Sequence, residues 1–352
     1  MKLFKCQACG NILYFENRTC GQCGHRLAYL PEQTMMSALE PAGDLWAPLA
    51  TPGQQRFLCR NAATDACNWL VPPGTNDALC VACRHNGVIP DLTDPSRLWA
   101  WQQIELAKHR LFFSLLRWTL PLATVDEDPA HGLSFEFLAD PAANTGPKIL
   151  TGHDEGKITI ALKEAEDAER ERRRVAMGEP YRTLLGHFRH EVGHHYWDVL
   201  VRNRNKLESF RAVFGDDTLD YGEALKRHYE QGSPPNWPEQ FISQYATTHP
   251  WEDFAETWAH YLHIVDTLEM VAASGMSVRP VVDNTGDHSA TVEFDPYCAN
   301  SIEQLLESWL PFVFAINSVS RAMGERDLYP FVIAPPVVKK LGFVHGLIHG
   351  QV

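Results

Sequence analysis

Residues 184–200 read LLGHFRHEVGHHYWDVL, and their apolar spacing predicts one continuous helix with an apolar stripe on one side and histidines on the other. His190 and His194 are four residues apart, so both imidazoles can reach one ion from the same helical face. Glu191 lies beside them, close enough to hold a water molecule without being a ligand. With 16 histidines in the chain, a chance His-Glu-x-x-His is the alternative. A catalytic zinc site therefore requires a third ligand downstream.

That ligand is predicted in residues 244–263, QYATTHPWEDFAETWAHYLH, where a proline and periodic apolar residues indicate a second helix starting near Trp251. Glu252 and Glu256 are one turn apart on it. We expect Glu252 to bind zinc and Glu256 to accept a hydrogen bond from the free imidazole nitrogen of a ligand histidine. Ordinary surface acids are the alternative. Asp198, one turn past His194, either orients that imidazole or lies on the surface.

The first cysteines form two Cys-x-x-Cys pairs separated by ten residues, each followed by a glycine. Two such knuckles can enclose one ion in a tetrahedral site, so residues 1–30 are predicted to be a zinc ribbon. A segment this short cannot build a core, and metal binding would supply most of its folding free energy. A redox pair is the alternative. The predicted ligands are Cys6, Cys9, Cys20 and Cys23.

A second cysteine group follows residues 31–55, whose proline, alanine and glycine content predicts a linker. Its first half is not a standard knuckle, but a second four-cysteine zinc site over residues 56–90 is the simplest use of these thiols. Spacing alone leaves crossed pairings between the two groups open. The predicted ligands are Cys59, Cys67, Cys80 and Cys83.

The composition is that of a globular protein: 352 residues, 45% hydrophobic and 21% charged. The start lacks an apolar secretory run, and no membrane-length apolar stretch follows, so we expect a cytoplasmic protein without a membrane partner. Clustered cysteines in a reducing compartment favour metal over disulfides. The net charge is −13, and residues 1–90 hold seven Lys and Arg against six Asp and Glu. Because nucleic-acid binding needs clustered positive charge, we do not expect it here.

Residues 91–352 are predicted to form a larger, mainly helical domain with a small β-sheet, which gives the chain an α+β fold. LSFEFL (133–138) and GKITIAL (156–162) alternate as short strands. GKITIAL is either a cleft edge to which a peptide adds as a further strand or part of the core.

Residues 187–263, with HFRHEVGHHYWD at one end and HPWEDFAETWAHYLH at the other, resemble the bacterial zinc-binding metallopeptidases that carry an amino-terminal zinc ribbon. The resemblance covers nearly the whole chain. The pattern is more distantly similar to gluzincins of the anthrax lethal factor and Pro-Pro endopeptidase type. It implies a zincin-like domain with Glu252 as third ligand. It also implies that Tyr245, seven residues before Glu252, faces the substrate carbonyl.

The leading hypothesis is a zinc metallopeptidase with one catalytic and two structural zinc ions, in which Glu191 is the general base and Tyr245 assists at the oxyanion. Its partners would be a peptide or protein substrate and a protein bound through the ribbons. The alternative is a protein- or nucleic-acid-binding ribbon protein with a non-catalytic, peptidase-like scaffold. A third possibility makes the ribbons structural braces.

Overall fold

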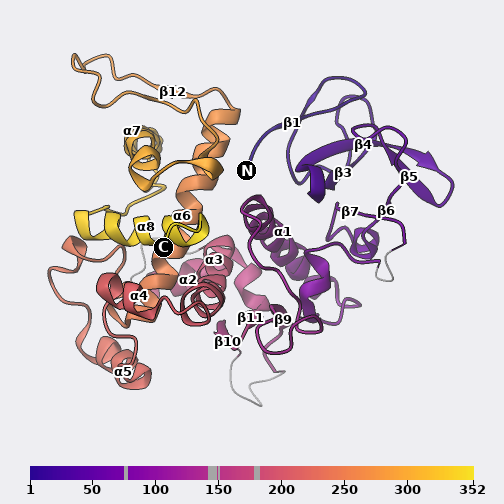
Figure 1. The fold of residues 1–352 in the computed structure, drawn as a ribbon. Helices are drawn as coiled ribbons and strands as arrows, with labels where there is room; N and C mark the ends of the chain where they lie inside the picture. Colours follow the sequence, from indigo (N-terminus) through magenta and orange to yellow (C-terminus); the bar gives the residue numbers. More distant parts are fainter. Residues whose placement is uncertain (75–77, 142–148, 150, 178–182) are drawn as a thin grey trace. The chain divides into compact units, whose positions relative to one another are not determined.

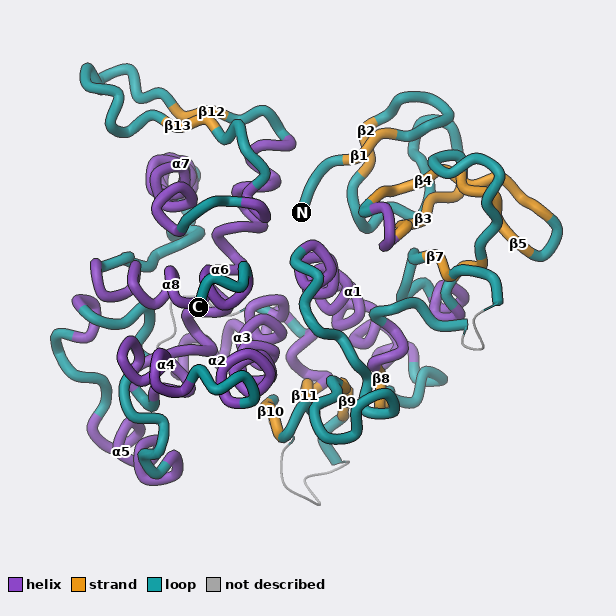
Figure 2. The backbone as a smooth tube through the Cα atoms, in the orientation of Figure 1, coloured by secondary structure: helices purple, strands orange, loops and turns teal. Residues whose placement is uncertain are grey.

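The computed structural model describes residues 1–352 apart from 75–77, 142–148, 150 and 178–182. The chain has a mixed α+β fold and forms two compact units, Met1–Arg170 and Glu171–Val352 (Figure 1). Small sheets and one long helix make up the first unit, and helices dominate the second (Figure 2). Among the described residues, no helix combines the length and the apolar character needed to cross a membrane.

The amino-terminal cysteines lie in tight turns around small sheets. Gly10 and Gly24 each donate a backbone hydrogen bond to the carbonyl of the first cysteine of their pair, at 2.9 Å, and both have positive φ, 79° and 76°, which favours glycine. The strands here are β1 (Phe4–Lys5) with β2 (Ile12–Leu13), β3 (Arg26–Leu30) with β4 (Met35–Ala42) and β5 (Leu45–Pro48), and β6 (Phe57–Leu58) with β7 (Leu70–Val71).

Residues 31–55, predicted to be a linker, are instead folded. They contain β4 and β5, which form an antiparallel hairpin in which Ala42 pairs with Leu45 across the two residues Gly43 and Asp44. The proline and alanine content misleads because Pro41 and Pro48 lie near the strand ends, where a missing N–H is tolerated. A Gly-Asp pair between apolar runs is the hairpin signal in this stretch.

A four-stranded sheet follows, in the order β10-β11-β9-β8, with β10 antiparallel to β11 and the other neighbours parallel. β11 therefore has a partner on both sides and is not an edge strand, and its Ile158 and Ile160 are buried in the core. Asp94 caps helix α1 (Pro95–Arg117), because its side chain accepts from the Ser96 N–H at 2.8 Å. The strands are β8 (Asn86–Val88), β9 (Ser134–Leu138), β10 (Gly152–Asp154) and β11 (Lys157–Ala161).

Helices make up most of the second unit. The stretch predicted as one helix forms α3 up to Tyr196 and continues as a π-helical segment, Trp197–Arg202. A short pair, β12 (Ser277–Val278) and β13 (Ala290–Thr291), interrupts the helices. Their bounds are α2 (Asp167–Met177, across the unit boundary), α3 (Leu184–Tyr196), α4 (Leu207–Phe214), α5 (Tyr221–Gln231), α6 (Pro250–Ala273), α7 (Ile302–Ala322) and α8 (Pro335–Ile348).

Among the described helices, α3 and α6 make the most extensive contact. Tyr196 stacks on Trp258 with ring centroids 5.0 Å apart, and buried Arg189 forms an ion pair with buried Asp266. At Gly193 the backbones nearly touch, since a Cβ there would lie 3.0 Å from Ala255 Cα. The glycine inside the His-Glu-x-x-His string thus sets how closely the two helices approach.

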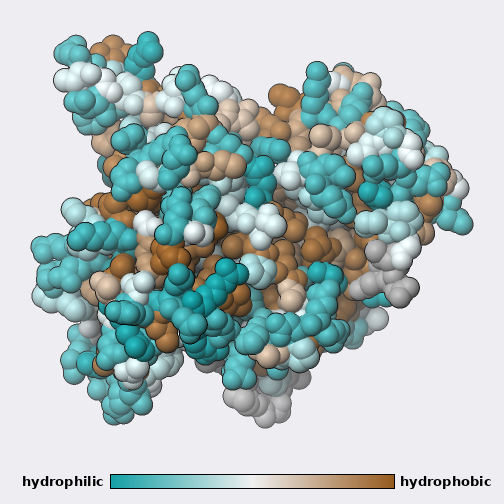
Figure 3. All heavy atoms as spheres, in the orientation of Figure 1, coloured by the Kyte–Doolittle hydropathy of each residue, from teal (hydrophilic) through white to brown (hydrophobic). Residues whose placement is uncertain are grey.

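Helix α5 lies on the surface of the second unit. Ala224 is its one buried residue, and hydrophilic atoms cover most of its segment in Figure 3. Its first residue, Tyr221, is 38% exposed but still contacts His249 and Trp251 of this unit through its ring. A hydrophilic helix with one inward-facing aromatic residue at its start can hold that side chain against a site without joining the core.

Replacing Gly193 with alanine should destabilise the fold. The added Cβ would meet Ala255 Cα at 3.0 Å and Ala255 O at 3.3 Å, which are backbone atoms that yield only if α3 and α6 separate. Overpacking of this kind costs about 1–3 kcal/mol, which exceeds the gain of about 1 kcal/mol in helix propensity. Urea unfolding followed by circular dichroism should show a lower midpoint.

Gly222→Ala is the matched control, because it is also a helical glycine but its Cβ would meet only Asp220 Oδ1, at an ordinary 3.4 Å. It should leave the unfolding midpoint unchanged or raise it. A Gly193→Ala chain as stable as the Gly222→Ala chain would show that the helix contact tolerates a methyl group.

Candidate metal centre

Three side chains from α3 and α6 converge in the second unit. Thr183 caps α3 by accepting from the Gly186 N–H at 2.9 Å, and one turn of this helix separates His190 from His194. Glu252 lies in the first turn of α6, where the helix dipole favours a negative charge. Its Oε2 lies 3.0 Å from His190 Nε2 and 3.3 Å from His194 Nε2.

These separations fit a shared zinc ion. Ligand atoms bound tetrahedrally at zinc–nitrogen and zinc–oxygen distances lie about 3.3 Å from one another. All three donor atoms fall within 4.8 Å of one another. Glu252 Oε2 has no hydrogen-bond donor among the described residues despite its two imidazole neighbours, so the three groups point toward a common centre rather than along bonds to each other. The donor set and its spacing therefore suit zinc.

The carboxylates around His190 favour positive charge at this position. Burial lowers the pKa of His190, but the neighbouring Glu252 and Glu256 carboxylates outweigh it and raise that pKa well above the usual value, so zinc bound here would displace the Nε2 proton. Burial raises the pKa of Glu252, but the two imidazoles outweigh it and hold that pKa well below the usual value. The carboxylate stays ionised, as a ligand must.

Glu256 lies one turn beyond Glu252 and holds His190 from behind. His190 Nδ1 donates to Glu256 Oε1 at 2.7 Å, and Ser243 Oγ donates to Glu256 Oε2 at 2.6 Å. With its proton on Nδ1, the imidazole presents the Nε2 lone pair toward Glu252 Oε2 and the candidate ion position. Of the two predicted acids, Glu252 therefore lies beside both imidazoles, and Glu256 orients His190.

Tyr221 is a site residue that the sequence analysis did not single out. Its hydroxyl donates to Glu252 Oε1 at 2.7 Å. Asp220 fixes the position of Tyr221 by capping α5, because its Oδ1 accepts from the Glu223 N–H at 2.8 Å. Tyr221 is 31 residues from Glu252 in sequence and shares no periodic pattern with it. The one signal in the sequence near Tyr221 is Asp220, an acid of the kind that caps the start of a helix.

Aromatic side chains enclose the centre. Trp251 lies on the His194 imidazole with ring centroids 3.6 Å apart. His249 caps α6 by accepting from the Trp251 N–H at 3.1 Å, while its other nitrogen donates to the Leu219 carbonyl at 3.1 Å. This cap fixes where the helix starts, and so fixes the positions of Trp251 and Glu252 in its first turn.

Tyr245 lies in a short 3-10 helix just before α6, with its ring centroid 5.8 Å from that of His190. Burial and the negative charge of Glu252 raise the pKa of Tyr245 well above its ordinary value. The phenol therefore keeps its proton at neutral pH.

Glu191 is partly buried beside the two histidines. Burial raises the pKa of its carboxyl group, and the positive charges of His190 and His194 lower it by less. A raised pKa brings a carboxylate closer to the range in which it can accept and return a proton.

Asp198 forms an ion pair with Arg202 at 3.0 Å, and its predicted role in orienting His194 stays a prediction.

The eight amino-terminal cysteines form two further groups in the first unit, in chain order and without crossing. In the first, Sγ atoms of Cys6 and Cys23 are 3.7 Å apart and those of Cys9 and Cys20 are 3.6 Å apart. In the second, Cys67 and Cys80 are 3.7 Å apart. Thiolates on one tetrahedral zinc ion lie about 3.8 Å apart, so both groups fit zinc.

Two family models match the chain. Residues 97–347 match the sequence model of the family described as "Putative zinc-binding metallo-peptidase", and residues 3–94 match that of a zinc-ribbon domain. Proteins of Mycobacterium tuberculosis (strain H37Rv) and Mycobacterium bovis, both named "Uncharacterized protein", are 38% identical over 349 residues, which cover 99% of this chain and 95% of each relative. No solved structure matches the chain.

Tyr221→Phe should weaken zinc binding at the His190 site, because Glu252 Oε1 loses the donor that holds the carboxylate in place. Loss of a partner of this kind typically costs about 10–100-fold in metal affinity. Competition with a chromophoric chelator measures the effect, and a His190→Ala chain identifies the zinc ion concerned. Tyr229→Phe, on the exposed side of the same helix, is the control. Equal affinities for both variants would contradict a role for Tyr221.

Proposed function

This chain belongs to the zinc-binding metallopeptidase family, and from that premise we propose that it hydrolyses peptide bonds at the centre formed by His190, His194 and Glu252. The observation that carries the proposal is the approach of Glu252 Oε2 to both imidazoles at 3.0 and 3.3 Å, with Glu191 adjacent on α3. A purely structural ion-pair network has no use for Glu191, whereas a hydrolase needs a base at that position.

A zinc ion held by these three residues would polarise the peptide carbonyl and lower the pKa of a water molecule toward about 7. Glu191 accepts a proton from water on its carboxylate and delivers it to the leaving amine nitrogen. Its raised pKa suits both steps, because a carboxyl group of ordinary acidity would hold the proton less well before the transfer to nitrogen.

Tyr245 is placed to assist at the carbonyl oxygen. Its hydroxyl keeps its proton because burial and Glu252 raise its pKa, so it can donate a hydrogen bond to the oxygen as negative charge develops there. A donor of this kind contributes roughly 3 kcal/mol when it is correctly aimed. Tyr245 lies on the same side of the site as His190, which supports this role.

The two cysteine groups complete the metal content as two structural zinc ions. Each group offers four cysteine sulfurs to one ion, and all four cysteines of the second group are buried. Structural zinc sites are closed by four protein ligands, whereas the His190 centre offers three and leaves a position for water. The proposed total is three zinc ions per chain.

Glu191→Gln should abolish hydrolysis while three zinc ions per chain and the fold are retained. The amide cannot accept the proton, but it has nearly the same shape. Activity is measured on a mixture-based library of quenched fluorescent peptides, with zinc counted by mass spectrometry of the dialysed protein. Glu230→Gln, at an exposed position on α5, is the control and should retain full activity. Full hydrolysis by Glu191→Gln would rule out the mechanism.

If the unmodified chain binds three zinc ions but cleaves no peptide in the library, the result would favour the alternative of a non-catalytic scaffold carrying zinc ribbons. That outcome differs from loss of the metal centre, because zinc content and peptide cleavage are read separately. The same preparation therefore distinguishes an inactive scaffold from a misassigned ligand set.

Tyr245→Phe should lower the turnover number about tenfold or more, because one hydrogen bond to the developing oxyanion is lost. The Michaelis constant and the zinc content should change little, since the phenyl ring keeps its packing against His190. Steady-state kinetics on one cleaved library peptide measures this, with Tyr229→Phe as control. An unchanged turnover number would make Tyr245 an aromatic residue of the core only.

A further inference from the structure

The second cysteine cluster has more donors than one zinc ion takes. Beside its four buried cysteines lies His109 of α1, which is also buried. His109 Nε2 is 3.2 Å from Cys67 Sγ, 3.6 Å from Cys83 Sγ and 3.8 Å from Cys80 Sγ. Structural zinc ions bind four ligands, so five candidate donors compete for four places.

The three distances match those between ligands of one ion. A nitrogen and a sulfur bound to tetrahedral zinc lie about 3.5 Å apart, given the usual zinc–nitrogen and zinc–sulfur bond lengths. His109 Nε2 lies close to that separation from three sulfurs at once. A hydrogen bond would direct an N–H toward one sulfur, because such bonds weaken steeply away from linearity.

The other side of the imidazole is already fixed. His109 Nδ1 lies 2.6 Å from the backbone carbonyl oxygen of Glu105, an atom that can only accept, so Nδ1 carries a proton. In the neutral ring this leaves the Nε2 lone pair facing the sulfurs. The Trp69 ring meets the imidazole edge-on, with centroids 5.0 Å apart, and restricts its rotation.

Charge also favours a histidine ligand at this position. Four thiolates on one dication leave a net charge of −2, whereas three thiolates and one neutral imidazole leave −1. The nearby Glu105 and Lys108, both fully buried and 2.8 Å apart, form an ion pair whose net charge is zero. Uncompensated charge in a buried site is costly, so the arrangement with the smaller charge is favoured.

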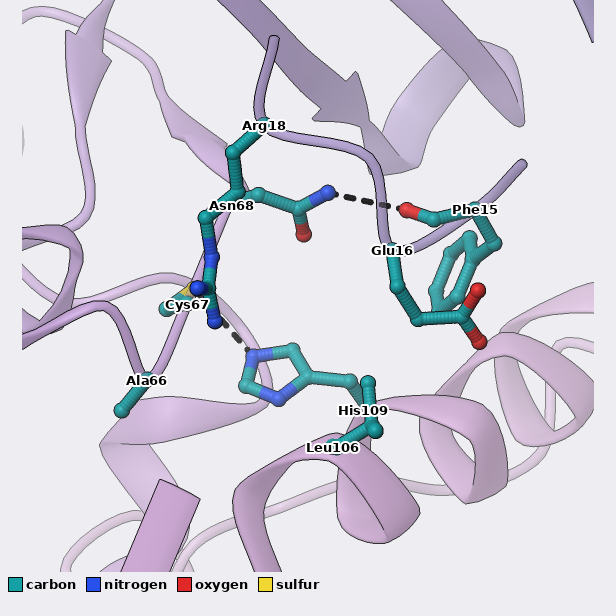
Figure 4. Close-up of a pocket in the computed structure, with 8 residues that line it drawn as sticks. All are labelled: Phe15, Glu16, Arg18, Ala66, Cys67, Asn68, Leu106 and His109. Atoms are coloured by element: carbon teal, nitrogen blue, oxygen red, sulfur yellow. Dashed lines mark hydrogen bonds between the residues drawn. The ribbon is translucent and has the colours of Figure 1, made fainter. Parts of the chain in front are cut away.

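A small cavity lies beside His109 in the first unit. His109 and Cys67 line a small cavity of about 20 Å³, which Figure 4 shows between the loop of the first ribbon and α1. Asn68 closes one side by donating to the Phe15 carbonyl at 2.8 Å. The space is sufficient for about one water molecule, so the His109 side of the cluster is not sealed by packing.

The Cys59 sulfur lies within 4.8 Å of the other three and accepts from the Cys80 N–H at 3.4 Å, so Cys59 and His109 are the two candidates for the fourth place. We propose that His109 Nε2 is a ligand of the second zinc ion, together with Cys67, Cys80 and Cys83, and that His109 takes the place of Cys59. The metal then joins the ribbon to α1, a helix that falls largely within the residues matched by the peptidase family. This inference rests on metal binding at the cysteine cluster and is independent of whether the His190 centre is catalytic.

The test uses the full chain, labelled with ¹⁵N-histidine and loaded with ¹¹³Cd in place of zinc. Each cadmium ion gives its own NMR resonance, and a directly bound imidazole nitrogen splits it. We expect a single nitrogen coupling at the second cluster, in addition to any at the His190 centre. A Cys67→Ser chain identifies the cluster resonance, and a His190→Ala chain identifies the other centre.

His109→Gln should remove the coupling at the second cluster, and Cys59→Ser should leave both the coupling and the metal in place. A cluster resonance without nitrogen splitting in the unmodified chain would overturn the proposal, because His109 would then be outside the coordination sphere. Loss of this cadmium ion in Cys59→Ser chains, equal to the loss in Cys67→Ser chains, would overturn it as well.

Discussion

The close approach of α3 and α6 is the contact on which the candidate centre depends. Gly193 allows it, since any side chain there would push against the Ala255 backbone. The glycine lies between the two histidines, and Ala255 lies between Glu252 and Glu256, so the point of closest approach and the donor atoms share the same turns of both helices. The packing of the two helices and the geometry of the donor atoms therefore depend on each other. A change of a few tenths of an ångström in the separation of α3 and α6 affects both.

Electrostatics explains why a cation suits this position. Three carboxylates gather around two imidazoles, and buried charge is costly unless it is compensated. Glu256 has a donor for each oxygen, from His190 and Ser243, and Glu252 Oε1 has Tyr221. The other oxygen of Glu252, Oε2, faces the two imidazole nitrogens instead of a donor. The hydrogen bonds thus leave one carboxylate oxygen to a positive ion.

The sequence predicted those parts of the molecule that depend on spacing within one element. Helical periodicity placed His190 with His194 and Glu252 with Glu256, and the cysteine pairs placed the ribbon. It could not supply Tyr221 or His109, because each reaches its partners across the fold from a helix whose pattern shows only which side is buried. The linker prediction for residues 31–55 was wrong, because it followed the proline, alanine and glycine content and missed the two-residue turn of a hairpin. The sequence analysis also left open whether GKITIAL was an edge strand.

The chain just after the second cluster bears on whether the ribbons form a separable module. β8 begins three residues after Cys83 and pairs in parallel with β9, so the last part of the cysteine region is a strand of the four-stranded sheet. His109 approaches the same cluster from α1. This helix also packs against the short segment Leu162–Ala165, which follows β11. A recognition module on a flexible tether would share neither a sheet nor a ligand with its neighbour. Both features favour a structural brace for the second cluster. The first ribbon also contacts α1, because Phe15 meets Phe113 edge-on with ring centroids 5.4 Å apart and Arg110 donates to Glu16 at 2.6 Å, so the same interpretation extends to it.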